Sequence, residues 1–156
     1  MFTPLQKKDN PFQISIGVAT FERRFEDYFV PLLTKIRSFE MDAEIVVAIN
    51  GEHGQEFGEA YRKRMLEFLS GHQKTFPIFF PAFRSLSKLW NTILIHASGQ
   101  FVLMLNDDTL ITDGKFMAKI GNILKKNEGR SFLINRSWSH FVARKEEMAR
   151  LGYFDE

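Results

Sequence analysis

A chain of 156 residues, 44% of them hydrophobic and 26% charged, suffices for one domain with a substantial core. Its formal net charge of +2 does not indicate nucleic-acid binding, and no stretch approaches the roughly 20 apolar residues of a membrane-spanning helix. The absence of cysteine excludes disulfides, thiolate metal sites and cysteine nucleophiles from these residues, so we expect a cytoplasmic protein, which a partner could still hold at the periphery of a membrane.

The chain alternates between β-prone runs and amphipathic helical stripes. Strands are predicted over residues 14–20, 44–50, 78–80 and 101–105. Helices are predicted over residues 26–39, 57–68 and 86–97. Pro31 lies inside the first helical stretch, so this helix either begins near Tyr28 or is kinked. The prolines that flank the third strand, Pro77 and Pro81, favour a position at the edge of the sheet.

The last third of the chain continues this alternation less regularly. A helix capped by Thr112 or Asp113 is expected, with an apolar stripe between Phe116 and Leu124. Two further strands and a short helix are predicted over residues 132–134, 141–143 and 145–151. Such alternation is typical of the α/β class, and we predict a mostly parallel central sheet with helices on both faces.

The most informative feature is the apolar run 101–105, which ends abruptly at Asn106-Asp107-Asp108. A continuous apolar run indicates a strand buried on both faces. Ionised carboxylates cannot follow it into the core, so Asp107 and Asp108 must emerge at the carboxyl edge of the sheet, where open α/β sheets bind ligands. Two adjacent acids repel each other unless a cation lies between them, so this run predicts a metal or phosphate site.

Polar residues also follow the first two predicted strands, as Thr20-Phe21-Glu22-Arg23 and Asn50-Gly51-Glu52-His53. Parallel strands would bring all three strand ends to one rim. That set suits a nucleotide diphosphate, with the base held at the first two strand ends and the phosphates neutralised through a divalent cation at the third. No G-x-G-x-x-G turn follows the first strand, which argues against nicotinamide binding, and no Walker-type glycine loop is present to hold phosphates. Arg23 and Arg24 could reach a phosphate, although a solvated pair is the simpler interpretation.

Three segments of the sequence then form a familiar pattern. Leu89-Trp90-Asn91 lies on a predicted helix, the turn Ala97-Ser98-Gly99 leads into the strand that ends at Asn106-Asp107-Asp108, and the last residues are Leu151-Gly152-Tyr153-Phe154-Asp155-Glu156. Together they resemble a family-two glycosyltransferase with the GT-A fold. Asn106 stands at the first acidic place of the family's D-x-D motif, and Tyr153 replaces the second glycine of its Gly-Gly-Phe-Asp-Glu segment.

The resemblance implies transfer of a sugar from a nucleotide-diphosphate donor, such as a UDP- or GDP-sugar, to the hydroxyl of an unknown acceptor, with inversion favoured. It implies one GT-A domain over residues 1–156. This domain would consist of an N-terminal extension (1–12), a nucleotide-binding half (13–110) and the start of an acceptor-side half (111–156). Mn²⁺ or Mg²⁺ would bridge the donor phosphates and bind Asp108, with Asp107 helping or contacting the ribose. The family's general base lies beyond the Phe-Asp-Glu segment, so we expect the base after Glu156.

The expected site residues fall into two groups. Those expected to bind the donor are Thr20, Phe21, Glu22, Asn50, Lys88, Asn91, Asn106 and Asp107. Those expected on the acceptor side are Trp138, Asp155 and Glu156. Lys88 is equally consistent with a solvated helix position, and Asn91 with a hydrogen bond between helix and loop. Asp107 and Asp108 could also simply begin a turn.

Two other functions stay open at this point. A phosphatase of the haloacid dehalogenase type carries D-x-D-x-T after a strand, but Asn106 and Leu110 would replace the nucleophilic Asp and the Thr, and that motif normally follows the first strand. The other alternative is a binding module without catalysis, which recognises a nucleotide sugar or a partner protein. Binding of a nucleotide-sugar donor would distinguish the binding module from the phosphatase. Turnover of that donor would distinguish the transferase from the binding module.

Overall fold

The computed structural model describes residues 12–51 and 58–156, and its centre is a six-stranded sheet in the order β3-β2-β1-β4-β6-β5. The strands are β1 (Ile14–Phe21), β2 (Ile45–Asn50), β3 (Thr75–Phe79), β4 (Phe101–Asn106), β5 (Phe132–Ile134) and β6 (Ser137–Arg144). The helices are α1 (Val30–Phe39), α2 (Glu59–Ser70), α3 (Leu86–His96), α4 (Phe116–Lys126) and α5 (Lys145–Leu151). β1 to β4 run parallel, whereas β6 is antiparallel to β4 and to β5. The predicted α/β fold with a mostly parallel sheet is confirmed.

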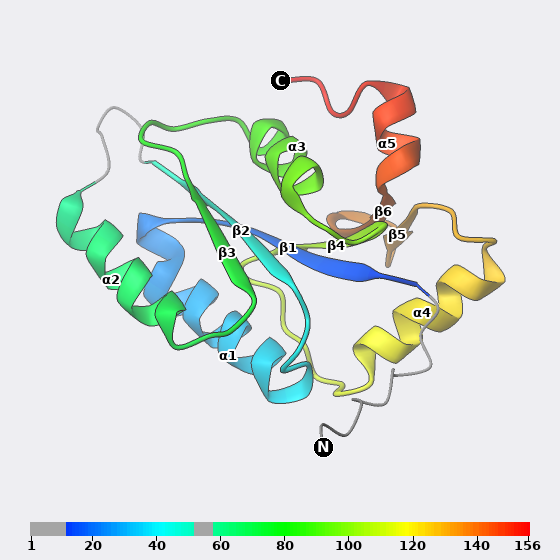
Figure 1. The fold of residues 1–156 in the computed structure, drawn as a ribbon, viewed down its shortest axis with the longest axis horizontal. Helices are drawn as coiled ribbons and strands as arrows, with labels where there is room; N and C mark the ends of the chain where they lie inside the picture. The colour runs from blue at the N-terminus through cyan, green and yellow to red at the C-terminus, as the bar shows by residue number, and fades with distance from the viewer. Residues whose placement is uncertain (1–11, 52–57) are drawn as a thin grey trace, which may run out of the picture.

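Helices cover both faces of the sheet (Figure 1). Helices α1, α2 and α4 pack on one face, where their apolar stripes meet alternate residues of β1, β2 and β4. Helix α3 packs on the other face, and Met148 of α5 joins the same cluster. Because both faces are covered, β2 is buried along its whole length, and β4 is buried up to Leu105.

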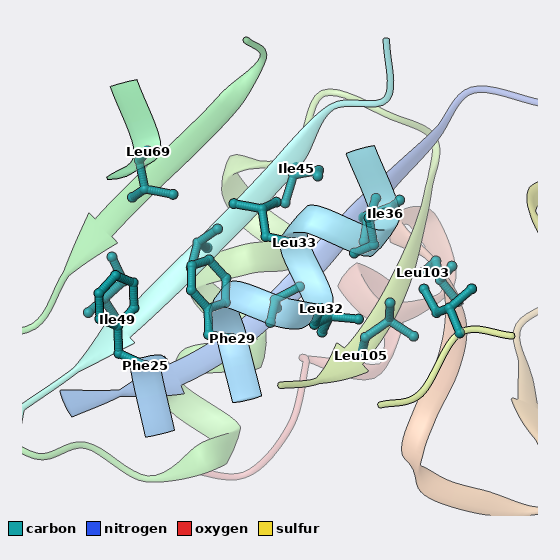
Figure 2. Packing of buried hydrophobic residues seen from close by; sticks show 14 of the residues in the cluster. Phe25, Phe29, Leu32, Leu33, Ile36, Ile45, Ile49, Leu69, Leu103 and Leu105 are labelled. Carbon is teal, nitrogen blue, oxygen red and sulfur yellow. The ribbon is translucent and has the colours of Figure 1, made fainter. Parts of the chain in front are cut away.

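The first crossover shows how the sequence directs this packing. Phe25, Phe29, Leu33 and Ile36 point from the helical segment toward the sheet, at the spacing of one helix face (Figure 2). Residues Phe25–Phe29 form a π-helical turn, and α1 begins at Val30. Pro31 therefore lies in the first turn of α1, directly after the π-helical turn, a position where proline is common. The start predicted near Tyr28 was close.

Three of the predicted element boundaries were wrong. β3 begins at Thr75, so Pro77 lies inside the strand; its missing N–H is tolerated because β3 is the edge strand that was expected. α4 begins after Lys115 and has no side-chain cap, and Asp113 instead accepts a hydrogen bond from the backbone N–H of Lys115 at 2.8 Å. β6 is longer than the predicted strand. The expected start of the second helix at Phe57 lies outside the described residues.

The strand order places a crevice at one end of the sheet. From β1 the chain goes to β2 and β3 on one side, and it returns through α3 on the opposite face to pair β4 with the other side of β1. The order reverses between β1 and β4, and such a switch point opens a crevice at the carboxyl ends of the strands. Across 12–51 and 58–156, no helix is long and apolar enough to span a bilayer.

The contact between β1 and α3 depends on a glycine. A Cβ added at Gly17 would clash with Cγ2 of Ile93 and lie 3.0 Å from Sδ of Met104. We predict that Gly17→Ala lowers the free energy of unfolding by about 1–3 kcal/mol, because the two elements must move apart. Gly71→Ala is the control, since its Cβ would meet nothing closer than 3.5 Å; it should change stability by less than about 0.5 kcal/mol or raise it slightly. Urea unfolding of both variants measures this, and equal effects would contradict the packing.

Candidate functional site

A cavity of about 350 Å³ opens at the switch point between β1 and β4. Its lining comes from the ends of β1, β2 and β4, from the turn after β1, from the loop before α3 and from the first turns of α3. The lining residues are Ala19, Thr20, Phe21, Arg24, Asn50, Phe83, Arg84, Leu86, Leu89, Asn106, Asp107 and Asp108. A cleft of this size, mostly apolar with a few converging polar groups, is the form that small-molecule sites commonly take.

Asp107 is the most firmly held polar group of this cavity. Its carboxylate is buried, with 5% of the side chain exposed. Thr20 donates a hydrogen bond to its Oδ2 at 2.8 Å, which ties the end of β1 to the end of β4. Arg24 Nε donates to Oδ1 at 2.8 Å and to Oδ2 at 3.1 Å, and Nη2 lies 2.8 Å from Oδ1. Both carboxylate oxygens are therefore satisfied by charged or hydroxyl donors.

Arg24 is the cation that the acid pair requires. Its Nη2 also lies 2.8 Å from Oδ2 of Asp108, so one guanidinium bridges both aspartates. The hydrogen bond to Asp107 raises the pKa of Arg24 despite partial burial, so the guanidinium stays charged. Its central carbon sits 4.3 Å from the centre of the Tyr28 ring, which supports it from the side. The interpretation of Arg24 as a solvated residue was wrong, and no local sequence pattern pairs it with Asp107, which lies 83 residues away.

The two aspartates differ sharply in exposure. The side chain of Asp108 is 50% exposed, ten times the fraction of Asp107, and it contacts only the outer edge of the guanidinium. Within the described residues, no group of three or more His, Cys, Asp or Glu could hold a metal ion. A carboxylate at the cavity lip still fits Mg²⁺ or Mn²⁺, because such ions commonly take one or two carboxylates and complete their shell with substrate phosphates and water. Asp108 suits that role.

Of the three residues expected to bind the donor at the end of β1, two line the cavity and one does not. Thr20 and Phe21 line the cavity, and Thr20 also anchors Asp107. Glu22 begins the 3₁₀ turn Glu22–Arg24 and is not among the lining residues. That turn carries the chain sideways from β1, and Arg24 at its end reaches back over the cavity.

Asn50 lines the cavity, but its amide is committed to the backbone. Its Nδ2 donates to the carbonyl of Arg84 at 2.9 Å, and its Oδ1 accepts from the N–H of Arg84 at 2.8 Å. The neighbouring Gly51 allows close approach, since a Cβ there would lie 2.8 Å from the backbone of Ala82. Asn50 thus positions the loop that carries Phe83 and Arg84 over the cavity. Glu52 and His53 lie outside the described residues.

Lys88 and Asn91 belong to a second arrangement. The side chain of Asn91 bonds the backbone carbonyl and N–H of Phe154 at 2.8 and 3.0 Å, and its Nδ2 also donates to Glu156 at 3.0 Å. Lys88 Nζ lies 2.9 Å from the same carboxylate. These hydrogen bonds hold the pKa of Glu156 below its usual value. The structure therefore brings Lys88 and Asn91 of α3 together with Glu156. None of the three is among the residues that line the cavity.

Trp138 lies on an aromatic cluster beside that segment. Its ring meets Phe141 and Phe154 edge-on, with centroids 5.6 and 5.9 Å apart, while 57% of the residue is exposed. Trp90 is buried in the same cluster, against Phe141 and Phe154. A second cavity, of about 220 Å³ and mostly apolar, opens next to Trp138 between β6 and α5.

Comparison with solved structures relates this fold to glycosyltransferases. The mannosyltransferase PcManGT from Pyrobaculum calidifontis, in complex with GDP-Man and Mn²⁺, matches 98% of this chain with a TM-score of 0.67 and 15% identity. TarS from S. aureus matches 92% with a TM-score of 0.69 and 14% identity, and the bifunctional glycosyltransferase WbbM matches 94% with 0.53 and 10%. No family model and no curated protein sequence matches the chain.

These likenesses show a shared fold. The chain spans 51% of the length of PcManGT and 30% of that of TarS. The predicted resemblance to glycosyltransferases is confirmed at the level of the fold, over nearly the whole chain and in the absence of strong sequence identity.

The unequal burial of the two aspartates gives a stability prediction. Asp107→Asn should lower the free energy of unfolding by about 1–3 kcal/mol, because Thr20 and Arg24 lose a buried charged acceptor. Asp108→Asn should change it by less than about 0.5 kcal/mol, because a half-exposed ion pair contributes little. Chemical unfolding of both variants measures the difference. Equal losses would mean that Asp107 does not anchor β1 to β4.

Proposed function

We propose that this domain transfers a sugar from a nucleotide-diphosphate donor to an acceptor hydroxyl. The observation that carries the proposal is the pair Asp107 and Asp108, one anchored and one exposed, at the lip of a cavity at the β1–β4 switch point. The fold is shared with glycosyltransferases, of which PcManGT was solved with GDP-Man and Mn²⁺. A UDP- or GDP-sugar is therefore the expected partner.

The cavity offers separate places for the parts of such a donor. Phe21, Phe83 and Leu86 provide apolar surface for the base, and Thr20 and Asn106 lie at the strand ends where the ribose would sit. Asp108 would hold Mn²⁺ or Mg²⁺ against the phosphates, while Asp107 fixes the geometry behind it. When bound, the divalent cation stabilises the charge that the diphosphate gains as the glycosidic bond breaks, typically by several kcal/mol.

The acceptor side is proposed at the C-terminal segment. Trp138 presents an exposed ring beside Phe154, and an aromatic face suits the C–H surface of a sugar. Lys88 and Asn91 would act indirectly, because they hold Phe154 and Glu156, the residues on either side of Asp155. Glu156 itself is a poor candidate for the general base, because its lowered pKa makes the carboxylate a weaker proton acceptor.

Donor binding is tested by calorimetry with GDP and UDP, with and without Mn²⁺. We predict that Mn²⁺ strengthens nucleotide binding and that Asp108→Ala weakens the Mn²⁺-dependent binding at least about tenfold, or roughly 1.4 kcal/mol. Asp113→Ala removes an acid outside the cavity lining and should leave it unchanged. Binding that is indifferent to both Mn²⁺ and Asp108 would contradict the proposal.

Turnover separates the proposal from its rivals. Release of nucleotide diphosphate from a UDP- or GDP-sugar, abolished by Asp108→Ala, supports the transferase. Metal-dependent binding without release supports the binding module. Hydrolysis of an aryl phosphate would instead support the phosphatase.

The acceptor side has its own test. We predict that a panel of mono- and disaccharides includes one that quenches the fluorescence of the exposed Trp138, and that Trp138→Phe abolishes the quench. Trp90→Phe, at a residue only 9% exposed, should retain it. Quenching that disappears with Trp90 and persists without Trp138 would exclude this platform.

A further inference from the structure

We infer that Arg24 is a positioning residue that exchanges partners: its guanidinium neutralises Asp107 and Asp108 in the absence of a donor, and it releases Asp108 for the donor's diphosphate when a divalent cation binds that carboxylate. This inference rests on the proposed function, and it assigns to Arg24 a role beyond holding the fold.

The contacts of Arg24 are asymmetric in a way that permits this exchange. Both Nε and Nη2 bind Asp107, whose side chain is 5% exposed. Only Nη2 reaches Asp108, whose side chain is 50% exposed. Breaking the outer contact leaves the Nε bonds to Asp107 intact, and an exposed ion pair is easily broken. Asp108 is therefore the partner that Arg24 gives up.

A metal ion at Asp108 would compete with Arg24 as long as Arg24 keeps its present position. Arg24 Nη2 occupies Oδ2 of Asp108 at 2.8 Å, an oxygen that a metal ion would share or take. A metal ion at the same oxygen would lie next to the guanidinium, and two neighbouring positive charges repel each other. The free cation should therefore bind weakly. A diphosphate brings the negative charge that lets both cations stay, so metal and diphosphate should bind more tightly together than apart.

The local backbone also supports a side chain that changes partner. Arg24 lies where the 3₁₀ turn meets the π-helical turn Phe25–Phe29, and π-helical turns are common at functional sites. Its guanidinium rests on the ring of Tyr28, at 4.3 Å, and lines the cavity. The ring can support the guanidinium while Nη2 moves from one anion to another.

The test measures binding of Mn²⁺ alone, from the electron paramagnetic resonance signal of the free ion. We predict that Arg24→Gln binds Mn²⁺ at least about tenfold more tightly than the wild type, because Asp107 and Asp108 lose their competing cation. The same variant should bind GDP or UDP in EDTA at least about threefold more weakly. Arg23→Gln makes the same charge change at the neighbouring residue and should alter neither affinity by more than about twofold.

If Arg24 only stabilises the fold, the Mn²⁺ titration gives a different result. Arg24→Gln would then bind Mn²⁺ no better than the wild type, or worse, and this outcome overturns the inference. If the variant does not fold, the ¹⁵Nε resonance of Arg24 in the wild type decides, assigned through its contact with Tyr28. It should shift with Mg²⁺ plus GDP far more than with Mg²⁺ alone, and an unchanged resonance overturns the exchange.

The inference and the proposed function fail separately. If Asp108→Ala leaves metal-dependent nucleotide binding intact, the proposed function fails. If Asp108→Ala abolishes that binding while Arg24→Gln leaves the affinity for Mn²⁺ alone unchanged, the donor site stands and only the exchange by Arg24 is overturned.

Discussion

Two neighbouring carboxylates at the end of a buried strand must find a positive charge, and this requirement shapes the whole rim of the sheet. Arg24 supplies the charge and Thr20 the remaining hydrogen bond, so the ends of β1 and β4 are joined through Asp107. Because the strand order reverses between these two strands, the residues of this interaction also line the crevice. Fold and site therefore depend on one charged cluster.

The polar residues on α3 serve a different purpose. Asn91 and Lys88 face the C-terminal segment, where they bind Phe154 and Glu156 across more than sixty positions of sequence. The apolar residues Leu86 and Leu89 of the same helix line the cavity at the β1–β4 switch point. Helix α3 thus connects the two regions: one face shapes the cavity, and another holds the segment that we assign to the acceptor side.

The sequence predicts the backbone of this site better than its side-chain partners. An apolar run that ends in aspartates has essentially one solution in an α/β fold, so the exit of Asp107 and Asp108 at the sheet edge could be predicted. The partners could not, because Arg24 is 83 residues from Asp107, and Asn50 is 34 residues from Arg84. Such pairs are decided by tertiary packing. For the same reason the interior position of Pro77 in β3 follows from its place at the sheet edge and not from local propensity.

The central claim is that Asp108 and its neighbours bind a metal-bridged diphosphate in the cavity between β1 and β4. The most direct measurement is the anomalous diffraction of Mn²⁺ in crystals soaked with Mn²⁺ and UDP or GDP. The account predicts a manganese peak about 2.0–2.6 Å from a carboxylate oxygen of Asp108 and from phosphate oxygens, with the base against Phe21. A nucleotide bound elsewhere, or a manganese-free cavity in which Arg24 still bridges both aspartates, would contradict it.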